Sequence, residues 1–140
     1  MLLADRKFAF EEHLSKQGLC LARKSPSILQ INLGKLCNLA CVHCHVNAGP
    51  GRKEIMDPAT FDRAIDWIAR SPSIETVDLT GGAPEMNPDF REFIVRVRAI
   101  RPDATIIDRC NLTILLEPGY EEMAEFLAFH RIQVVASMPC

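Results

Sequence analysis

The hydrophobic residues of this chain form two alternating patterns, which predict strands and helices in turn. Short apolar runs predict four buried strands, at residues 28–33, 76–80, 104–109 and 132–138. Apolar residues at helical spacing predict helices between them, at 57–70, at 87–101 and around Met123 and Leu127. The centres of the last three strands are about 30 residues apart, the length of a β-α-β unit. The pattern therefore predicts an α/β fold with a parallel sheet and right-handed crossovers.

Local signals set the expected ends of these helices. Asp57-Pro58 predicts a helix start, with an aspartate cap and a proline in the first turn. Asn87-Pro88 repeats that signal. A shorter helix is expected over residues 5–17, where a following Gly18 suits its C-terminal cap. The single tryptophan, Trp67, is expected in the core.

Half of the six cysteines lie within eight residues, as Cys37, Cys41 and Cys44 in the spacing Cys-x3-Cys-x2-Cys. Three thiolates this close can share one metal centre at small entropic cost. Sulfur ligands select iron–sulfur clusters, zinc or Cu(I) over hard cations. A cubic [4Fe–4S] cluster has four irons, so three cysteines leave one iron free to coordinate a small molecule. The spacing therefore favours an open iron–sulfur cluster.

Three other centres fit parts of the same stretch. Cys41 to His45 matches the C-x-x-C-H pattern of c-type haem attachment, but no export signal is visible. Zinc could bind the cysteines with His43 or His45, but the second paired half-site of a zinc finger is missing. A plant-type ferredoxin has one more residue between its first two cysteines. The open cluster remains the favoured interpretation.

The composition limits the class of protein and the compartment in which such a metal centre is expected. A length of 140 residues suggests one domain, and 48% hydrophobic residues suffice for a core. A net charge of −2 argues against binding to nucleic acid or an anionic membrane. No apolar run approaches the ~20 residues of a membrane span, and the charged start argues against a signal peptide. We therefore expect a cytoplasmic protein, in which cysteines bind metals or catalyse more often than they form disulfides.

The most distinctive residues follow the predicted strands, and the carboxyl ends of parallel strands gather ligands. They form four groups, one at each strand end: the cysteine stretch, Gly81 to Pro84, Arg109-Cys110-Asn111, and Ser137 with Cys140. Simpler roles exist for each group. The glycines also fit a tight turn, Asn111 and Ser137 a loop cap, and Cys110 a small core residue. Arg109 also fits an ion pair with an acid such as Asp108.

Three longer strings carry a resemblance to a known family. They run from Leu33 to Pro50, from Val77 to Pro88 and from Asp108 to Thr113. They resemble the radical S-adenosylmethionine (radical SAM) superfamily and, within it, the arsenosugar biosynthesis radical SAM protein family. The resemblance implies a partial radical-SAM-type (β/α) barrel. Because that family is longer, residues 28–140 would be the N-terminal part of the core domain, ending after the fourth strand, and residues 1–27 an N-terminal extension.

The resemblance also implies roles for individual residues. Cys37, Cys41 and Cys44 would hold a [4Fe–4S] cluster. Gly81 and Gly82 match a Gly-Gly-Glu motif whose backbone binds the methionyl ammonium of SAM. Further positions implied to bind SAM are Ala83 and Pro84 in that motif, His43 near the adenine, and Arg109, Asn111 and Ser137 near the ribose or carboxylate. Ala83 departs from the motif, because glutamate is usual there.

The implied reaction is the reductive cleavage of SAM to methionine and a 5′-deoxyadenosyl radical. In the arsenosugar family the adenosyl group is then added to a trivalent methylated arsenic. Arsenic binds thiolates, so Cys110 and Cys140 are candidate substrate ligands. The electron would come from a donor such as flavodoxin or ferredoxin. Two alternatives stay open: a radical SAM enzyme for another substrate, as in peptide maturation, and a non-catalytic iron–sulfur or zinc module.

Overall fold

A computed structural model describes residues 10–137 and contains one four-stranded sheet. The strands are β1 (Ile28–Asn32), β2 (Thr76–Thr80), β3 (Thr105–Asp108) and β4 (Gln133–Val134). They lie in the order β1-β2-β3-β4, and every neighbouring pair is parallel. The α/β class and the parallel sheet are confirmed. The fourth strand is shorter than predicted, and its expected last residue, Met138, lies outside the described residues.

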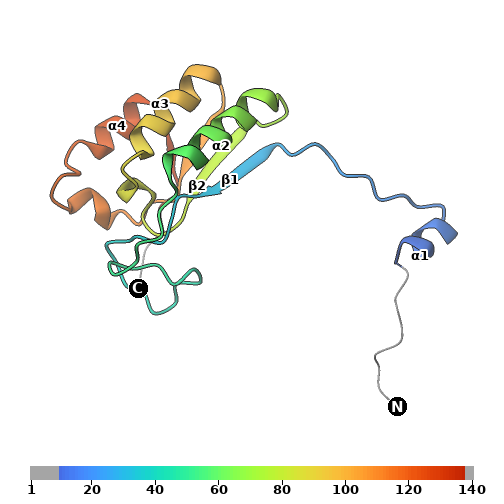
Figure 1. Cartoon of the computed structure of the whole chain (residues 1–140), viewed down its shortest axis with the longest axis horizontal. Coiled ribbons are helices and arrows are strands. Elements are labelled where there is room, and N and C mark those ends of the chain that lie inside the picture. Colours follow the sequence, from blue (N-terminus) through green and yellow to red (C-terminus); the bar gives the residue numbers. More distant parts are fainter. Residues whose placement is uncertain (1–9, 138–140) are drawn as a thin grey trace, which may run out of the picture.

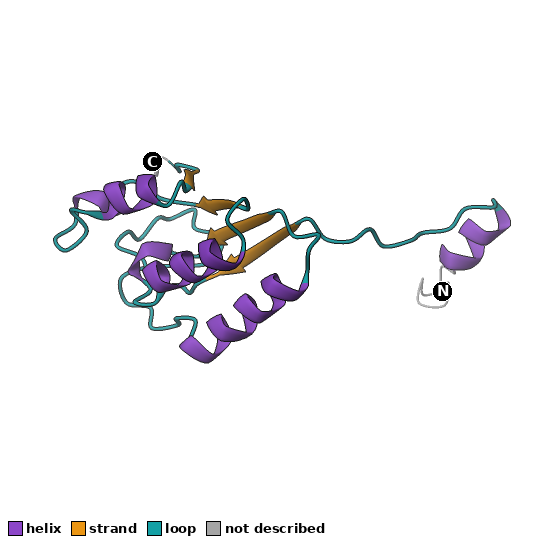
Figure 2. Cartoon of the chain, turned by 90° about the horizontal axis from the view of Figure 1, so that it is seen from above, coloured by secondary structure: helices purple, strands orange, loops and turns teal. Residues whose placement is uncertain are grey.

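Helices cover one face of this sheet. They are α2 (Pro58–Arg70), α3 (Phe90–Ile100) and α4 (Met123–Phe129), and Figures 1 and 2 show them side by side on that face. The largest fully buried side chains of this layer include Ile68, Val77, Leu79, Phe90, Phe93, Ile94, Val97 and Ile106. Burial of these apolar groups supplies most of the stability of the fold. We refer to the sheet with its three helices as the layer.

The two predicted helix starts have different outcomes. Asp57 caps α2, because its Oδ1 accepts a hydrogen bond from the Thr60 amide at 2.7 Å. The start predicted at Asn87 is wrong, because α3 begins at Phe90. The Asn87 side chain donates instead to the carbonyls of Leu33 (3.0 Å) and Met56 (3.1 Å). Its amide nitrogen therefore serves a tertiary contact, while its Oδ1 accepts from the Asp89 amide at 2.9 Å, just before α3.

The other face of the sheet carries polar side chains and no helix in the described part of the chain. Only Ile31 of β1 is buried, so the expectation of a fully buried first strand is wrong. On this face Gln30 is in register with Asp78 of the neighbouring strand. Arg109 follows β3 and reaches the same aspartate. The sheet therefore has one apolar, helix-covered face and one open polar face.

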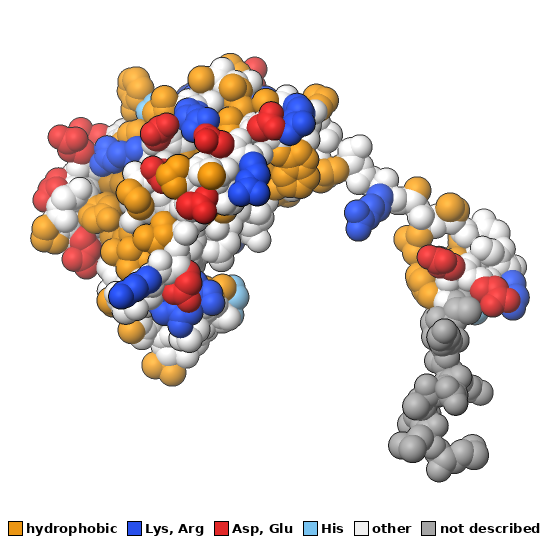
Figure 3. Space-filling model, viewed as in Figure 1, with side chains coloured by type: hydrophobic (Ala, Val, Ile, Leu, Met, Phe, Trp, Pro, Cys, Tyr) orange, Lys and Arg blue, Asp and Glu red, His pale blue; other side chains and the backbone are white. Residues whose placement is uncertain are grey.

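The N-terminal helix α1 (Phe10–Lys16) lies away from the layer, and none of its residues is buried. Gly18 follows it with φ +68°, in the left-handed region expected of a helix-ending glycine. Trp67 is 51% exposed, so its predicted core position is wrong. None of the helices within residues 10–137 has the length and apolar character needed to cross a bilayer. Figure 3 shows acidic and basic side chains mixed on the outer face of the layer.

Candidate functional site

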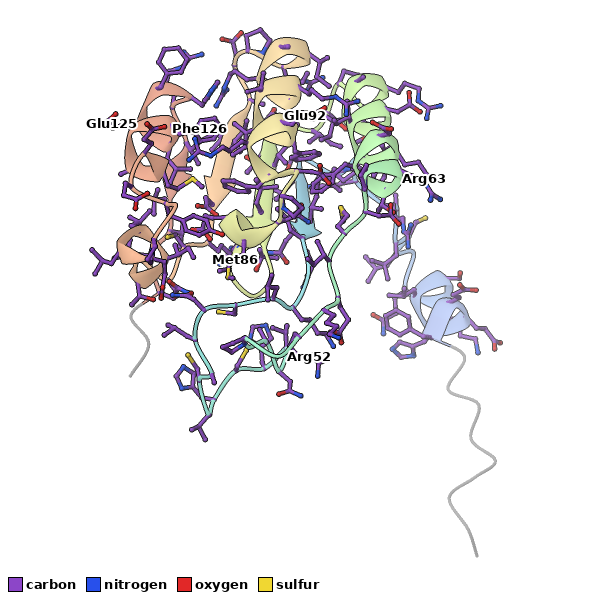
Figure 4. All side chains as sticks on the ribbon, turned by 60° about the vertical axis from the view of Figure 1, so that its left-hand side comes forward. Arg52, Arg63, Met86, Glu92, Glu125 and Phe126 are labelled. Carbon is purple, nitrogen blue, oxygen red and sulfur yellow. The ribbon has the colours of Figure 1, made fainter. Side chains whose placement is uncertain are left out.

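The site is built on residues 33–56, a segment between β1 and α2 that we call the cysteine loop. It contains only isolated bridges, which pair Gly34 with Ile55 and Leu36 with Gly49. Figure 4 shows the loop below the layer, with Arg52 in the loop and Met86 where the loop meets the layer. Backbone hydrogen bonds therefore shape this segment, in place of helices or strands.

The loop brings the three predicted cluster cysteines to one cavity of about 260 Å³. The cavity is lined by Cys37, Leu39, Cys41, His43, Cys44, His45, Ala48, Gly81, Gly82, Asn111 and Ser137. Its residues come from the cysteine loop and from the segments that follow β2, β3 and β4. The prediction that distant strand ends meet at one edge is thus realised for these residues. Cys37 is buried, whereas Cys41 and Cys44 are partly exposed.

The three sulfur atoms have unequal surroundings. Cys37 Sγ accepts from the Leu39 amide at 3.5 Å and from Asn111 Nδ2 at 3.7 Å. Cys44 Sγ accepts from the Ala48 amide at 3.3 Å. Donors of this kind stabilise thiolates and tune the potential of an iron–sulfur centre. The Cys37 position is therefore the most strongly hydrogen-bonded of the three.

Asn111 is held in place by its own neighbours. Its Oδ1 accepts from the Ile114 amide and from Thr113 Oγ1, both at 3.0 Å. Its Nδ2 also donates to Asn38 Oδ1 at 2.8 Å. Leu112, between these partners, has φ +62°, an unfavourable conformation for a side chain of this kind. The backbone strain at Leu112 accompanies an asparagine side chain aimed at Cys37.

Glycine is required where the cysteine loop meets the turn after β2. A Cβ added at Gly82 would lie 2.2 Å from the Leu36 carbonyl oxygen and 3.0 Å from Cys37 Cβ. Gly81 has φ +144°, and a Cβ there would lie 2.6 Å from the Gly34 carbonyl oxygen. The Gly82 amide donates to that same Gly34 oxygen at 3.0 Å. The glycines therefore allow two backbone segments to touch.

The carbonyl oxygens of Gly81 and Gly82 have no recorded hydrogen-bond partner within residues 10–137. Both glycines line the cavity, whereas the neighbouring Ala83 and Pro84 are buried and do not. The Ala83 amide donates to the Leu36 carbonyl at 2.9 Å. Ala83 and Pro84 thus support the turn, while the two glycines face the cavity.

This donor set fits a cluster held by three cysteines. Cys37, Cys41 and Cys44 form no disulfide and share the cavity. A side chain on Gly82 would occupy the space beside Cys37. Exposed His43 and His45 line the same cavity, so the donor types of a zinc site are also present. Soft sulfur donors suit either centre.

Arg109 lies on the open polar face and does not line the cavity. Its Nε and a terminal nitrogen donate to the two carboxylate oxygens of Asp78, each at 2.8 Å. Gln30 Nε2 donates to Asp78 Oδ2 at 2.9 Å. The hydrogen bonds from Arg109 hold the pKa of Asp78 below its usual range, against the opposing effect of burial. The expected alternative of an ion pair is realised with Asp78, because Asp108 points to the opposite face of the sheet.

Cys110 also lies outside the cavity and is fully buried. Its sulfur lies beside the carboxyl groups of Glu85 and Asp108, with all ligand atoms within 4.8 Å of one another. Burial, followed by the nearby Glu85, raises the pKa of Asp108 to about 9. Burial likewise raises the pKa of the Cys110 thiol. Cys140, its predicted partner in substrate binding, lies outside the described residues.

Several residues of this region were not predicted from the sequence. Asn38 and Thr113 complete the hydrogen-bond network around Asn111, since Asn38 Nδ2 donates to Thr113 Oγ1 at 2.9 Å. The sequence held one clue, because a Cys-Asn pair occurs in both segments, at Cys37-Asn38 and at Cys110-Asn111. The grouping of Glu85 with Asp108 had no such clue. Their positions 23 residues apart show no pattern until η2 (Pro84–Met86) and β3 are folded together.

The sequence of this chain is similar to those of several known proteins. The sequence pattern of the radical SAM superfamily matches residues 31–136. A probable GTP 3′,8-cyclase of Pyrococcus abyssi is 36% identical over 78 residues, covering 56% of this chain and 25% of that protein. A glutamate 2,3-aminomutase of Clostridioides difficile is 31% identical over 87 residues, covering 61% of this chain and 20% of that protein.

A solved structure shares the fold. The crystal structure of BtrN in complex with AdoMet and 2-DOIA matches with a TM-score of 0.67 at 19% identity. The match covers 85% of this chain and 48% of BtrN. The α/β sheet with its helices is therefore the fold of a radical SAM enzyme. This chain spans about a quarter of the first curated relative's length and about half of BtrN.

Proposed function

Because this chain belongs to the radical SAM superfamily, whose enzymes use a [4Fe–4S] cluster and SAM, we propose that it cleaves SAM reductively with a cluster held by Cys37, Cys41 and Cys44. The observation behind the proposal is the shared cavity of these cysteines and the Gly81-Gly82 turn. Three protein ligands leave one iron of a cubane open, and the cavity is where a small molecule reaches it. The chain's own residues then have distinct tasks.

The two glycine carbonyls suit the ammonium group of SAM. They are acceptors without a partner among the described residues, and both glycines line the cavity. A primary ammonium donates up to three hydrogen bonds, so both oxygens can be used at once. A side chain at either glycine would obstruct the backbone that presents these oxygens. Gly81 and Gly82 therefore orient the cofactor.

Other cavity residues bind and shield the rest of SAM. His43 and Ser137 line the cavity and offer a ring and a hydroxyl to the nucleoside. Asn111 lines the cavity too, but its amide donates to Cys37 Sγ, so we assign it to the support of that ligand. When both cofactors are bound, the chemistry supplied is one-electron cleavage of a sulfonium bond. The protein's part is to hold SAM and exclude water.

For the substrate, we propose a trivalent methylated arsenic compound, as in arsenosugar biosynthesis. The support is the resemblance carried by residues 33–50, 77–88 and 108–113. The relatives described above are a cyclase and an aminomutase, so they support radical chemistry and do not identify an arsenic substrate. A role for Cys110 in arsenic binding stays a prediction, and its burial requires movement of the chain around it. Another radical SAM substrate is the second candidate.

The test of SAM cleavage is anaerobic reconstitution with iron and sulfide, followed by reduction and measurement of 5′-deoxyadenosine. We expect cleavage in the unaltered chain and none when Cys37, Cys41 and Cys44 are replaced by alanine. Cys20→Ser is the matched control, because Cys20 is free and exposed and does not line the cavity. Cleavage that survives in the triple variant would refute the cluster assignment. So would zinc that the anaerobically purified protein holds and the triple variant loses, because this would place zinc on the three cysteines.

The substrate is tested by product analysis with and without methylated arsenite. An adenosyl–arsenic product that forms only with both substrates supports the arsenosugar role. Cleavage of SAM at the same rate with no arsenic in the product would favour another radical SAM reaction. This result would leave the cluster and the SAM site in place.

A further inference from the structure

A compact group of side chains lies near the Gly81-Gly82 turn at the cavity. It consists of Glu85, Asp108 and Cys110. Glu85 lies in η2, whereas Asp108 ends β3 and Cys110 follows it two residues later. One ligand atom from each residue lies within 4.8 Å of the other two. The three residues thus converge from two separate segments on one point inside the protein. We call them the buried triad.

The buried triad is shielded from water, and its side chains interact with one another rather than with a cation or an outside donor. Asp108 is 0% exposed and Glu85 is 4% exposed. None of the four carboxylate oxygens accepts a hydrogen bond from any residue in the described part of the chain. The nearest arginine in sequence, Arg109, points to the opposite face and pairs with Asp78. Buried carboxylates without a donor or a cation are strongly unfavourable.

Either a proton or a metal cation can stabilise the buried carboxylates. One proton shared between the two acids reaches two of the four oxygens. The Cys110 S–H is a weak donor, and its sulfur already accepts from the Leu112 amide at 3.2 Å. One cation can contact both carboxylates and the sulfur together. The mixture of two acids with a thiol, converging on one point, favours the cation.

We propose that Glu85, Asp108 and Cys110 form a second metal site, separate from the cluster, which binds a divalent cation of Zn²⁺ type. A thiolate ligand disfavours Mg²⁺ and Ca²⁺, and carboxylate oxygens suit zinc alongside sulfur. Binding displaces the protons held by the thiol and the carboxyl groups, and these protons leave to solvent. The metal would join η2, next to the Gly81-Gly82 turn, to the end of β3, which carries Asn111. It would therefore brace two segments of the cavity wall.

The test measures metal content in the full chain, purified anaerobically and reconstituted with its cluster. We expect one equivalent of zinc beyond the cluster iron, and its loss to less than about a tenth in Asp108→Asn. Cys20→Ser should keep the zinc, because that free cysteine is exposed. The variant with Cys37, Cys41 and Cys44 replaced by alanine should also keep it. Zinc that disappears only in this last variant would place the metal at the cluster cysteines and overturn the proposal.

Cadmium gives a second readout that does not depend on enzyme activity. Cd²⁺ bound to a thiolate has an ultraviolet charge-transfer band, which we expect in the cluster-free alanine variant. Replacing Cys110 by serine in that background should abolish the band, whereas replacing Cys20 should not. A band unaffected by the Cys110 change would exclude this sulfur as a ligand. Circular dichroism of each variant shows whether the fold is retained.

Thermal unfolding separates the metal from the shared proton. Asparagine has the shape of a protonated aspartate, so Asp108→Asn preserves a proton-sharing pair but weakens a metal site. We expect added Zn²⁺ to raise the melting temperature of the unaltered chain and not that of the variant. Glu85→Gln is the second variant, in case one replacement fails to fold. A melting temperature unchanged by both substitutions and by zinc would show that the acids share a proton.

Discussion

The cysteine loop and the layer behind it differ in how deeply their side chains are buried. Phe90, Phe93 and Val97 of the layer are almost fully buried. The loop buries fewer side chains, among them Leu33, Cys37 and Ala48, and its Cys41 and Cys44 are partly exposed at the wall of a cavity. Stability therefore resides in one region and the proposed chemistry in the other. The comparison teaches that substitutions in the layer should act mainly on folding, and substitutions in the loop mainly on cofactor binding.

The largest expected effect is the loss of stability caused by a cavity in the layer. Phe93→Ala removes a buried ring that packs on Phe61 at a centroid distance of 4.8 Å. We expect a loss of about 3–5 kcal/mol in the free energy of unfolding, measured by denaturant titration. Trp67→Ala is the matched control, since that ring is half exposed and should cost far less. An equal loss in both variants would contradict the division between the covered and outer faces of the helices.

A methyl group at the junction should damage the site more than the layer. In Gly82→Ala, the new Cβ would clash with the Leu36 carbonyl, so the loop must move. We expect at least a tenfold loss in SAM affinity, measured by equilibrium binding to the reconstituted protein. Gly51→Ala is the control, because nothing lies within 4 Å of a Cβ there. Equal affinity in the two variants would argue against the close approach of loop and turn.

Removal of the Asn111 amide should change the cluster without removing it. Its N–H donates to Cys37 Sγ, and such a bond favours the more negative, reduced cluster. In Asn111→Ala we expect the midpoint potential to fall by about 30–60 mV, from the loss of about 1 kcal/mol. Potentiometric titration followed by electron paramagnetic resonance measures this shift. Ser137→Ala, a cavity residue without a bond to a cysteine sulfur, should leave the potential unchanged.

The smallest effect is expected on the open polar face. The folded pKa of Asp78 is lowered, chiefly by Arg109, so its ion pair stabilises the fold above the unfolded pKa of about 3.9. That contribution is lost as the pH falls through the lower folded pKa. We expect Asp78→Asn to cost about 1 kcal/mol or less at pH 7, and its deficit to shrink as the pH falls below about 3.9, the unfolded pKa. A deficit that stays constant with pH would exclude the ion pair as its cause.

The sequence predicts the layer well because helix and strand periodicity is a local property. Phe61, Ile65 and Ile68 fall on one stripe, and the structure buries all three. The core position predicted for Trp67 is wrong because Trp67 lies beside that stripe and is half exposed. Asn87 was misassigned because its side chain serves a contact with residues far away in the sequence. Local patterns do not contain such long-range partners.

For the site, the cysteine spacing predicts the cluster ligands and says nothing of their surroundings. The resemblance implied a SAM contact for Arg109, but strand alternation turns this residue toward Asp78 on the open face. Ala83 stands where the motif has glutamate, and the nearby Glu85 is buried against Asp108 and Cys110. These placements depend on strand register and on the path of η2. Both are set by packing across the sheet, which spacing along the chain does not record.

The contacts of Asn87 affect how far the length of the cysteine loop can vary. Its single carboxamide binds the carbonyls of Leu33 and Met56, the first and last residues of the cysteine loop. The two roots of the loop are thus fastened together at one point on the layer. Insertions or deletions between those roots would add little closure entropy and would leave the strands undisturbed. One scaffold could therefore carry loops of many lengths, and with them many shapes of cavity.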